Sequence, residues 1–101
     1  MPKIKLVVSD APATLTTYGS LWKFPRAAGD KPVIDLVTVR GVANTLDLPT
    51  GRYQYYFTFT GQQDDDEFTL TMKYASAQAP APTSTPFRTV PAGSRVFRFL
   101  V

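Results

Sequence analysis

The side chains in this chain that could do chemistry are carboxylates, lysines, tyrosines and hydroxyls, because the sequence contains neither histidine nor cysteine. Those two residues supply the usual general base near neutral pH, the thiol nucleophile and most zinc and copper ligands. Glycoside hydrolysis would still need two opposed carboxylates in one cleft. The acidic residues outside one acidic run are Asp10, Asp30, Asp35 and Asp47, all expected in loops or near strand ends. No poised acid–base pair is visible, so we predict that the chain is not an enzyme.

The acidic run Asp64–Glu67 is where several oxygen ligands for a hard cation stand together. Calcium takes several oxygen ligands from a loop, which makes Asp64, Asp65 and Asp66 candidate metal ligands. The run lacks the spaced acidic pattern of an EF-hand, and consecutive side chains of an extended chain point in alternating directions. A solvated turn accounts for the same residues. We favour the turn and expect no cofactor, with Ca²⁺ as the alternative.

Three aromatic residues are candidates for an exposed ligand platform: Tyr18, Trp22 and Tyr56. Tyr18 and Trp22 flank a predicted turn, and Tyr56 alternates with the polar residues Gln54 and Thr58. Flat aromatic surfaces of this kind bind sugar rings or bases. For Trp22 the favoured interpretation is instead a place in the core. The 11 basic residues are scattered along the chain, which disfavours nucleic acid and leaves carbohydrate as the favoured ligand of such a platform.

Alternation of apolar and polar side chains predicts that strands position these residues. The segment Leu46–Tyr74 contains two runs with a period of two, separated by a polar stretch at 61–67. The bulky residues that share a face are Tyr53, Tyr55, Phe57 and Phe59 in the first run, and Phe68, Leu70, Met72 and Tyr74 in the second. This period is the strongest strand signal in a single sequence. We predict a β-hairpin whose apolar face forms half of a core.

Further strands are predicted along the rest of the chain, and no segment shows a helical period. The expected strands are Lys3–Val8, Thr14–Thr17, Leu21–Phe24, Val33–Arg40 and Ser94–Val101. The nearly continuous apolar character of Val33–Arg40 predicts a central strand buried on both faces over part of its length. The sequence therefore predicts an all-β fold in one domain, 1–101. We expect a single antiparallel β-sandwich, immunoglobulin-like or jelly-roll-like, of about seven or eight strands.

The segment Ala75–Ser94 differs in composition from the rest of the chain. It contains four prolines among small and polar residues: Pro80, Pro82, Pro86 and Pro91. Proline at this density prevents both a helix and a regular strand ladder. We predict a long proline-rich extended loop or arm before the last strand, which Phe87 and Val90 pin to the body as a short edge strand.

One short motif resembles immunoglobulin-like and fibronectin-type β-sandwich modules. The motif is Leu48-Pro49-Thr50-Gly51-Arg52-Tyr53, followed by alternating aromatics. In those modules a turn of this kind leads to a tyrosine at a strand start, whose hydroxyl bonds back to nearby backbone in a tyrosine corner. The resemblance implies sandwich architecture and that role for Tyr53. The chain lacks the two cysteines of the antibody inter-sheet bridge, and the resemblance implies no binding residues.

These observations predict the class of function rather than a ligand. The N-terminal apolar run is too short for a classical signal peptide, and no run reaches the length of a membrane span. We therefore expect no membrane partner, and a cytoplasmic chain or part of a larger assembly. The predicted function is a non-catalytic structural or interaction module that self-associates or docks to a larger assembly, with a protein partner or homo-oligomer. The alternative is a carbohydrate-binding module, with calcium as a second ligand.

Overall fold

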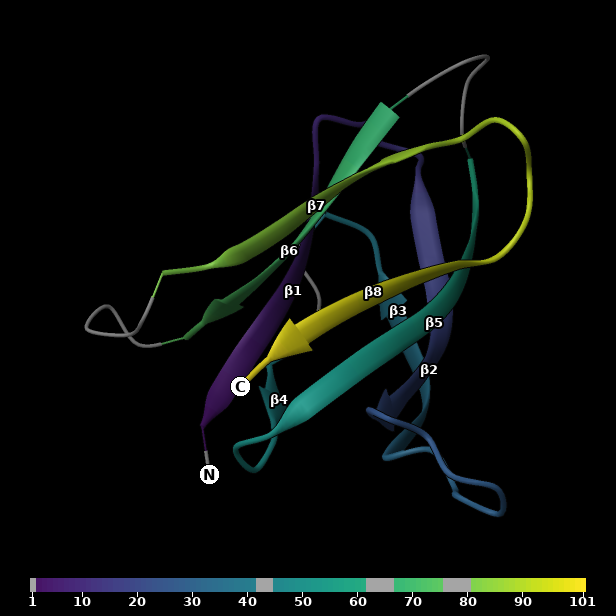
Figure 1. The fold of residues 1–101 in the computed structure, drawn as a ribbon. Coiled ribbons are helices and arrows are strands. Elements are labelled where there is room, and N and C mark those ends of the chain that lie inside the picture. Colours follow the sequence, from purple (N-terminus) through teal and green to yellow (C-terminus); the bar gives the residue numbers. More distant parts are fainter. Residues whose placement is uncertain (1, 42–44, 62–66, 76–80) are drawn as a thin grey trace.

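The computed structural model describes residues 2–41, 45–61, 67–75 and 81–101. The described residues form eight β-strands and no helix, in two four-stranded antiparallel sheets that pack face to face (Figure 1). This arrangement confirms the predicted all-β sandwich. The strands are β1 (Lys3–Ser9), β2 (Thr16–Lys23), β3 (Ile34–Val39), β4 (Leu46–Asp47), β5 (Arg52–Thr60), β6 (Glu67–Tyr74), β7 (Thr83–Arg88) and β8 (Arg95–Leu100).

Each sheet has its own strand order. Sheet 1 has the order β4-β1-β6-β7, and sheet 2 has the order β3-β2-β5-β8. The predicted hairpin of Tyr53–Tyr74 is therefore wrong, because β5 pairs with β2 and β8 while β6 pairs with β1 and β7. Two strands with one apolar face each can pack side by side or face to face, since both arrangements bury the same side chains. Here the chain crosses between sheets, and the two faces meet across the core.

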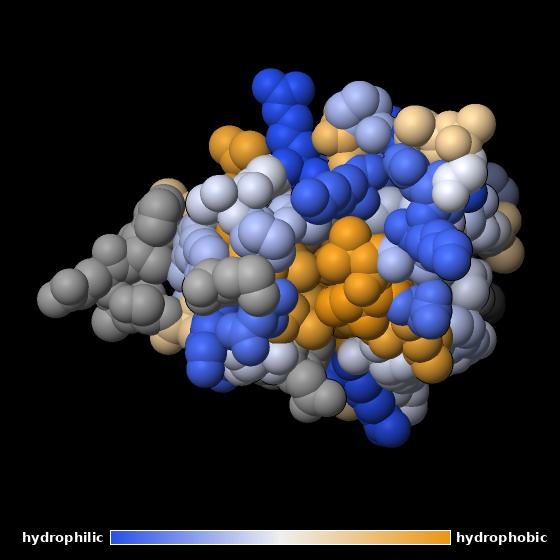
Figure 2. Space-filling view, turned by 90° about the horizontal axis from the view of Figure 1, so that it is seen from below, coloured by the Kyte–Doolittle hydropathy of each residue, from blue (hydrophilic) through white to orange (hydrophobic). Residues whose placement is uncertain are grey.

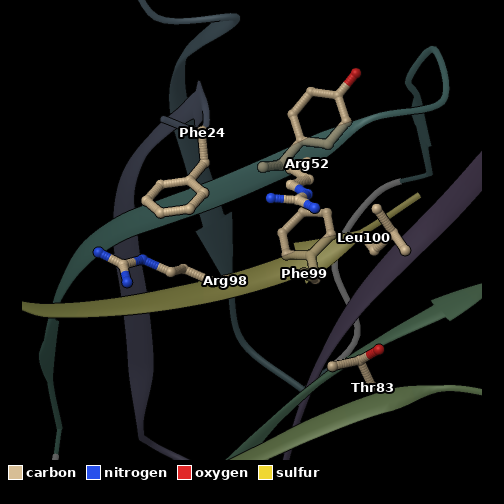
Figure 3. A pocket seen from close by; sticks show the side chains of 7 residues that line it. Phe24, Arg52, Thr83, Arg98, Phe99 and Leu100 are labelled. Atoms are coloured by element: carbon tan, nitrogen blue, oxygen red, sulfur yellow. The ribbon is translucent and has the colours of Figure 1, made fainter. Parts of the chain in front are cut away.

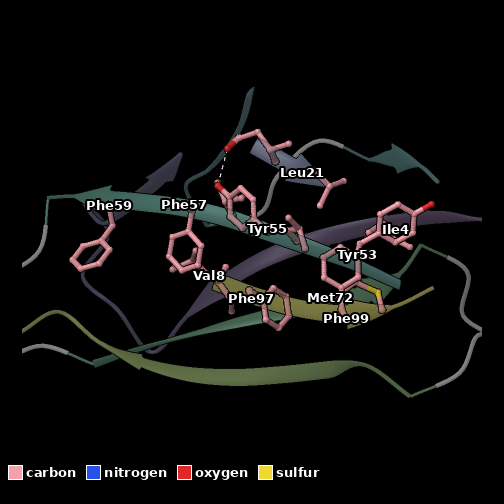
Figure 4. Packing of buried hydrophobic residues seen from close by; sticks show 14 of the residues in the cluster. Ile4, Val8, Leu21, Tyr53, Tyr55, Phe57, Phe59, Met72, Phe97 and Phe99 are labelled. Carbon is pink, nitrogen blue, oxygen red and sulfur yellow. Dashed lines mark hydrogen bonds between the residues drawn. The ribbon is translucent and has the colours of Figure 1, made fainter. Parts of the chain in front are cut away.

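The core consists of the inward side chains of both sheets. It contains the predicted aromatic row of β5, which Figure 4 shows pointing into the core. Of the predicted apolar row of β6, Phe68, Leu70 and Met72 are buried, and Tyr74 is partly buried against the core. Contacts across the two sheets are close: the ring centroids of Phe57 in β5 and Phe68 in β6 are 6.3 Å apart, in an edge-to-face arrangement. Such aromatic pairs contribute beyond their buried area. The buried hydrophobic residues are Ile4, Leu6, Val8, Leu15, Leu21, Val37, Val39, Leu48, Tyr53, Tyr55, Phe57, Phe59, Phe68, Leu70, Met72, Phe97, Phe99 and Val101.

Two expectations about strands need correction. The predicted turn between Tyr18 and Trp22, which separated the expected strands Thr14–Thr17 and Leu21–Phe24, is wrong, because one continuous strand, β2, runs from Thr16 to Lys23. The strand at Val33–Arg40 was predicted to be central, but β3 is an edge strand of sheet 2 and its Leu36 is 67% exposed. β3 also has a bulge opposite β2, where the register shifts, so apolar side chains reach both the core and the solvent. β-branched residues suit an edge strand as well as a central one, which is why composition misplaced it.

The proline-rich segment contains a regular strand. Within Ala75–Ser94, β7 pairs with β6 over six residues, and Pro86 sits opposite Thr69 on the sheet edge, where proline is tolerated. Phe87 packs against the core as expected, with its ring centroid 5.3 Å from that of Phe57. Val90, which was expected to help pin the segment, is exposed.

The turn before β5 has the hydrogen bond expected of a tyrosine corner. The Tyr53 hydroxyl donates to the carbonyl oxygen of Pro49 at 2.7 Å, while the tyrosine ring is buried. This bond fixes the turn at one end of β5. The relation to immunoglobulin-like modules, which the same motif suggested, remains a prediction.

Candidate binding face

The outer face of sheet 2 is the surface of interest, because it carries aromatic, aliphatic and basic side chains together. Register places these side chains in rows across the strands: Ser20, Tyr56 and Val96 are neighbours, as are Trp22, Gln54 and Arg98. Arg52 is opposite Leu100, and Leu36 lies on the bulged edge strand β3. Successive side chains of a strand point to opposite faces of the sheet. The residues of these rows therefore point outward, because the residues next to them in the chain, such as Tyr55 and Phe57 in β5 and Phe97 and Phe99 in β8, point inward.

This face carries most of the exposed large hydrophobic residues. Six large hydrophobic residues of the described chain are exposed: Val33, Leu36, Tyr56, Val90, Val96 and Leu100. Four of them, Leu36, Tyr56, Val96 and Leu100, lie on the outer face of sheet 2. The outer face of sheet 1 presents lysines, threonines and serine instead, as at the Lys5–Lys73 and Thr71–Ser84 pairs. Exposed apolar residues are ordinary when scattered, whereas their concentration on one sheet face makes this face the candidate binding surface.

The structure brings the predicted platform residues Tyr18, Trp22 and Tyr56 onto this one face. Tyr18 and Tyr56 line the same hollow of about 330 Å³, together with Ser20, Asp35 and Leu36. Trp22 lies one row away, and its indole N–H donates to the Ser20 hydroxyl at 2.7 Å. Trp22 is half-buried outside the core, so the favoured prediction of a core tryptophan is wrong.

Arginine covers part of the aromatic surface. The guanidinium carbon of Arg26 lies 3.6 Å from the centroid of the Trp22 ring, and that of Arg98 lies 4.3 Å from the Phe24 ring. Both are cation–π contacts, which hold the charge over the ring face. The stacking surfaces of Trp22 and Phe24 are therefore already occupied on one side, while Tyr56 is 49% exposed.

A second hollow, of about 340 Å³, lies where the outer face meets the end of the sandwich (Figure 3). Its lining combines the aromatic rings of Phe24 and Phe99 with the guanidinium groups of Arg52 and Arg98 and with Leu100. Viewed from below relative to Figure 1, apolar surface gathers in the middle of this end and hydrophilic residues surround it (Figure 2). An apolar centre with a charged rim is the usual composition of a protein interface.

The charge of this face is positive and unbalanced. Within the described residues, none of Arg26, Arg52 and Arg98 has a carboxylate within ion-pair distance; the ion pair found there joins Arg88 to Glu67 at 3.1 Å. Asp35 is the acidic residue in the hollow beside Tyr18. Three arginines against one carboxylate give a face that attracts anionic groups and repels a second face of the same kind.

The remaining candidate residues do not form a site in the described part of the chain. Asp10 follows β1, Asp35 and Asp47 lie on strands of opposite sheets, and the Asp30 carboxylate accepts the backbone N–H of Ala27 at 2.7 Å within its own loop. Across residues 2–41, 45–61, 67–75 and 81–101, no group of three acidic side chains is placed to hold a metal ion. The candidate calcium ligands Asp64, Asp65 and Asp66 lie outside the described residues.

Sequence reasoning missed the contribution of the last strand to this face. The prediction covered its inward residues Phe97, Phe99 and Val101, which are buried. The same alternation places Val96, Arg98 and Leu100 outward. Two aliphatic residues flanking an arginine on the solvent side of a strand were the available signal.

No protein-family model matches this chain, and comparisons with curated proteins and with solved structures find no significant match. Helices able to span a membrane are absent from the part of the chain that the structure describes.

Proposed function

We propose that this chain is a non-catalytic interaction module that binds a protein partner through the outer face of sheet 2. The observation that carries the proposal is the concentration of Leu36, Tyr56, Val96 and Leu100 on that face, against a polar outer face of sheet 1. Aromatic and aliphatic anchors with arginine nearby are the composition of interface hot spots. Aliphatic side chains favour a protein over a sugar, because sugars are recognised by flat rings and hydrogen bonds.

Charge favours docking to another protein over pairing of two such faces. Face-to-face association of two copies would bring Arg26, Arg52 and Arg98 of one copy close to the same three arginines of the other copy. Like charges across an interface weaken binding. A partner with carboxylates beside apolar side chains meets no such repulsion. The two predicted modes, self-association and docking, therefore separate in their dependence on salt and concentration.

The test is partner capture with face variants, followed by calorimetry on the purified complex. Tyr56→Ser combined with Leu100→Ser should weaken binding by at least tenfold, because hot-spot truncation costs more than about 1–2 kcal/mol per residue. Thr71→Ser combined with Lys73→Ser on the outer face of sheet 1 is the matched control and should bind as the unmodified chain does. Equal binding by both double variants, or a chain that stays monomeric and captures no partner, would refute the proposal.

A second candidate function is carbohydrate binding, favoured by the hollow shared by Tyr18, Tyr56 and Asp35. A ring stacked on Tyr56 could hydrogen-bond Asp35, Ser20 and Thr58, which line the same space. Sugar binding should quench Trp22 fluorescence, since Trp22 lies in the adjacent row. A glycan array without any response, together with unchanged fluorescence, would remove this candidate.

A further inference from the structure

β8 has an open backbone edge. Gly51 and Val101 exchange both backbone hydrogen bonds, at 3.0 and 2.8 Å, and hydrogen-bonded pairs alternate along an antiparallel ladder. Counting back by two from Val101, the residues bonded to β5 are Phe99, Phe97 and Arg95. The N–H and C=O groups of Val96, Arg98 and Leu100 therefore point away from β5. No described residue makes a backbone hydrogen bond to them on that side.

Each of the other three sheet edges has a feature that hinders the addition of another strand. β4 has two residues, β7 carries Pro86, which lacks a backbone N–H, and β3 carries a bulge beside Asp35. Short edges, proline, bulges and charges are the devices by which proteins prevent added strands. β8 has six residues without proline or a register shift. Of its two arginines, Arg95 folds back on its own loop and donates to the carbonyl oxygens of Arg88 and Pro91.

The side chains beside this open edge define what an added strand would carry. Val96, Arg98 and Leu100 project on the outer face of sheet 2, with Val96 37% and Leu100 62% exposed. Directly opposed side chains on one face of an antiparallel pair contact each other, so apolar residues should face Val96 and Leu100 and a carboxylate should face Arg98. Arg52 of β5 lies directly opposite Leu100 of β8 and adds positive charge beside this end of the open edge.

We propose that β8 accepts an extended acidic segment of the partner protein as an antiparallel fifth strand of sheet 2, with the outward pattern apolar–acidic–apolar at every second residue. This inference rests on the proposed function and specifies its binding mode: main-chain hydrogen bonds give affinity, and alternate side chains give specificity. The added strand lies on the side of β8 away from β5, so it widens the outer face of sheet 2 beyond Val96, Arg98 and Leu100.

Other occupants of this edge fit less well. Two copies joined β8 to β8 in the register that centres on Arg98 would place the two Arg98 side chains directly opposite each other. Like charges that are directly opposed are destabilising. Single-stranded nucleic acid needs open stacking surfaces and a run of phosphate contacts. Arg26 and Arg98 already cover Trp22 and Phe24, and the aliphatic side chains at the edge contribute no stacking.

The probe is a blocked heptapeptide, Thr-Val-Thr-Glu-Thr-Val-Thr, titrated to millimolar concentration into the isotopically labelled full chain, with amide resonances and hydrogen exchange as readouts. We expect protection of the amides of Val96, Arg98 and Leu100, which are unbonded in the free chain, and little change at Phe97 and Phe99, which are already bonded to β5. A peptide N-methylated at its valines and glutamate lacks the donors that face β8 and should not bind.

Charge reversal tests the side-chain part of the proposal. Arg98→Glu should weaken the glutamate peptide about tenfold, because an attractive cross-strand pair becomes repulsive, and should strengthen a lysine peptide of otherwise identical sequence. Lys73→Glu makes the same charge change on the outer face of sheet 1 and should leave both affinities unchanged. Equal responses of the two variants would overturn the predicted acidic pattern.

The outcomes separate the binding mode from the proposed function. Resonance changes confined to Tyr18, Leu36 and Tyr56, without protection of the β8 amides, overturn strand addition and leave docking on the outer face standing. Protection that rises with protein concentration and without peptide assigns the edge to a second copy and overturns the choice of partner. The inference is also overturned if a thymidine oligonucleotide binds at the same amides more tightly than the heptapeptide does. It is equally overturned if the heptapeptide produces no response at all.

Discussion

Replacing Tyr55 by phenylalanine should destabilise the protein although the ring stays in place. The Tyr55 hydroxyl donates to the Val37 carbonyl oxygen at 2.7 Å, the bond drawn as a dashed line in Figure 4. The same hydroxyl lies 3.1 Å from the Thr17 hydroxyl. Because the tyrosine has one proton and gives it to Val37, the threonine is the donor in the second bond. The three residues lie on β5, β3 and β2, so this buried network ties three strands of sheet 2 together.

The magnitude follows from what Tyr55→Phe leaves behind. No apolar area is lost, but the Val37 carbonyl and the buried Thr17 hydroxyl each lose a partner. A buried polar group without its hydrogen bond costs roughly 1–3 kcal/mol, and part of the network can relax, so we expect the unfolding free energy to fall by about 2 kcal/mol. For a domain of this size, that corresponds to a melting temperature lower by about 8–16 °C.

The same hydroxyl predicts a dependence on alkaline pH. Burial raises the pKa of Tyr55 from 10.0 to about 12, while the hydrogen bond from Thr17 acts in the opposite direction. The folded chain therefore keeps this proton at a pH where the unfolded chain loses it. Its contribution to stability is complete below pH 10 and is lost as pH rises from 10 to 12. The stability difference between the unmodified chain and Tyr55→Phe should narrow across that window.

The assay is urea unfolding followed by Trp22 fluorescence, at pH 7 and at steps between pH 9 and 12. The control is Tyr56→Phe, which removes a hydroxyl from the exposed neighbour and should leave the midpoint unchanged. Equal midpoints for Tyr55→Phe and the unmodified chain at pH 7, or a difference that stays constant up to pH 12, would refute the reasoning.

Three further predictions concern single residues of the scaffold. Gly19→Ala should prevent stable folding, measured as loss of the cooperative urea transition, because a Cβ there would lie 1.9 Å from a backbone carbonyl oxygen of β5. Tyr53→Phe should lower the unfolding free energy by about 1 kcal/mol through loss of its bond to Pro49; an unchanged urea midpoint would contradict this. Glu67→Gln should shift thermal stability by less than about 1 kcal/mol, since its pair with Arg88 is exposed, and a larger shift would show that the pair matters.

Side-chain alternation predicts which face of a strand is buried but not which strand lies beside it. The aromatic row of β5 and the apolar row of β6 were predicted from period two alone, and both are in the core. Their pairing was wrong because burial against a neighbouring strand and burial against the opposite sheet impose the same pattern. Strand order depends on long-range contacts, such as that between β1 and β6, which leave no local signal.

The candidate binding face could be predicted from the sequence only in part, because alternation shows which residues point outward but not which of them lie together. Tyr56 stood out because it breaks the inward aromatic series of β5, and its exposure agrees with that interpretation. Its proximity to Tyr18 depends on the register of β2 against β5, which sequence alone left open. The contact of Arg26 with Trp22 comes from the loop after β2, and loop geometry carries no periodicity from which such a contact could be predicted.

In the proposed binding mode, Arg98 sets which strands the open edge of β8 accepts. An edge strand with free backbone groups and aliphatic side chains invites non-specific pairing. On β8, Arg98 stands between Val96 and Leu100, so a strand that offers a cation or only apolar residues at the central position leaves this charge unpaired. A strand with a carboxylate there satisfies it. In the proposed binding mode, the same residue disfavours copies of this chain and favours an acidic partner, because specificity requires a cost for the wrong partner as well as a gain for the right one.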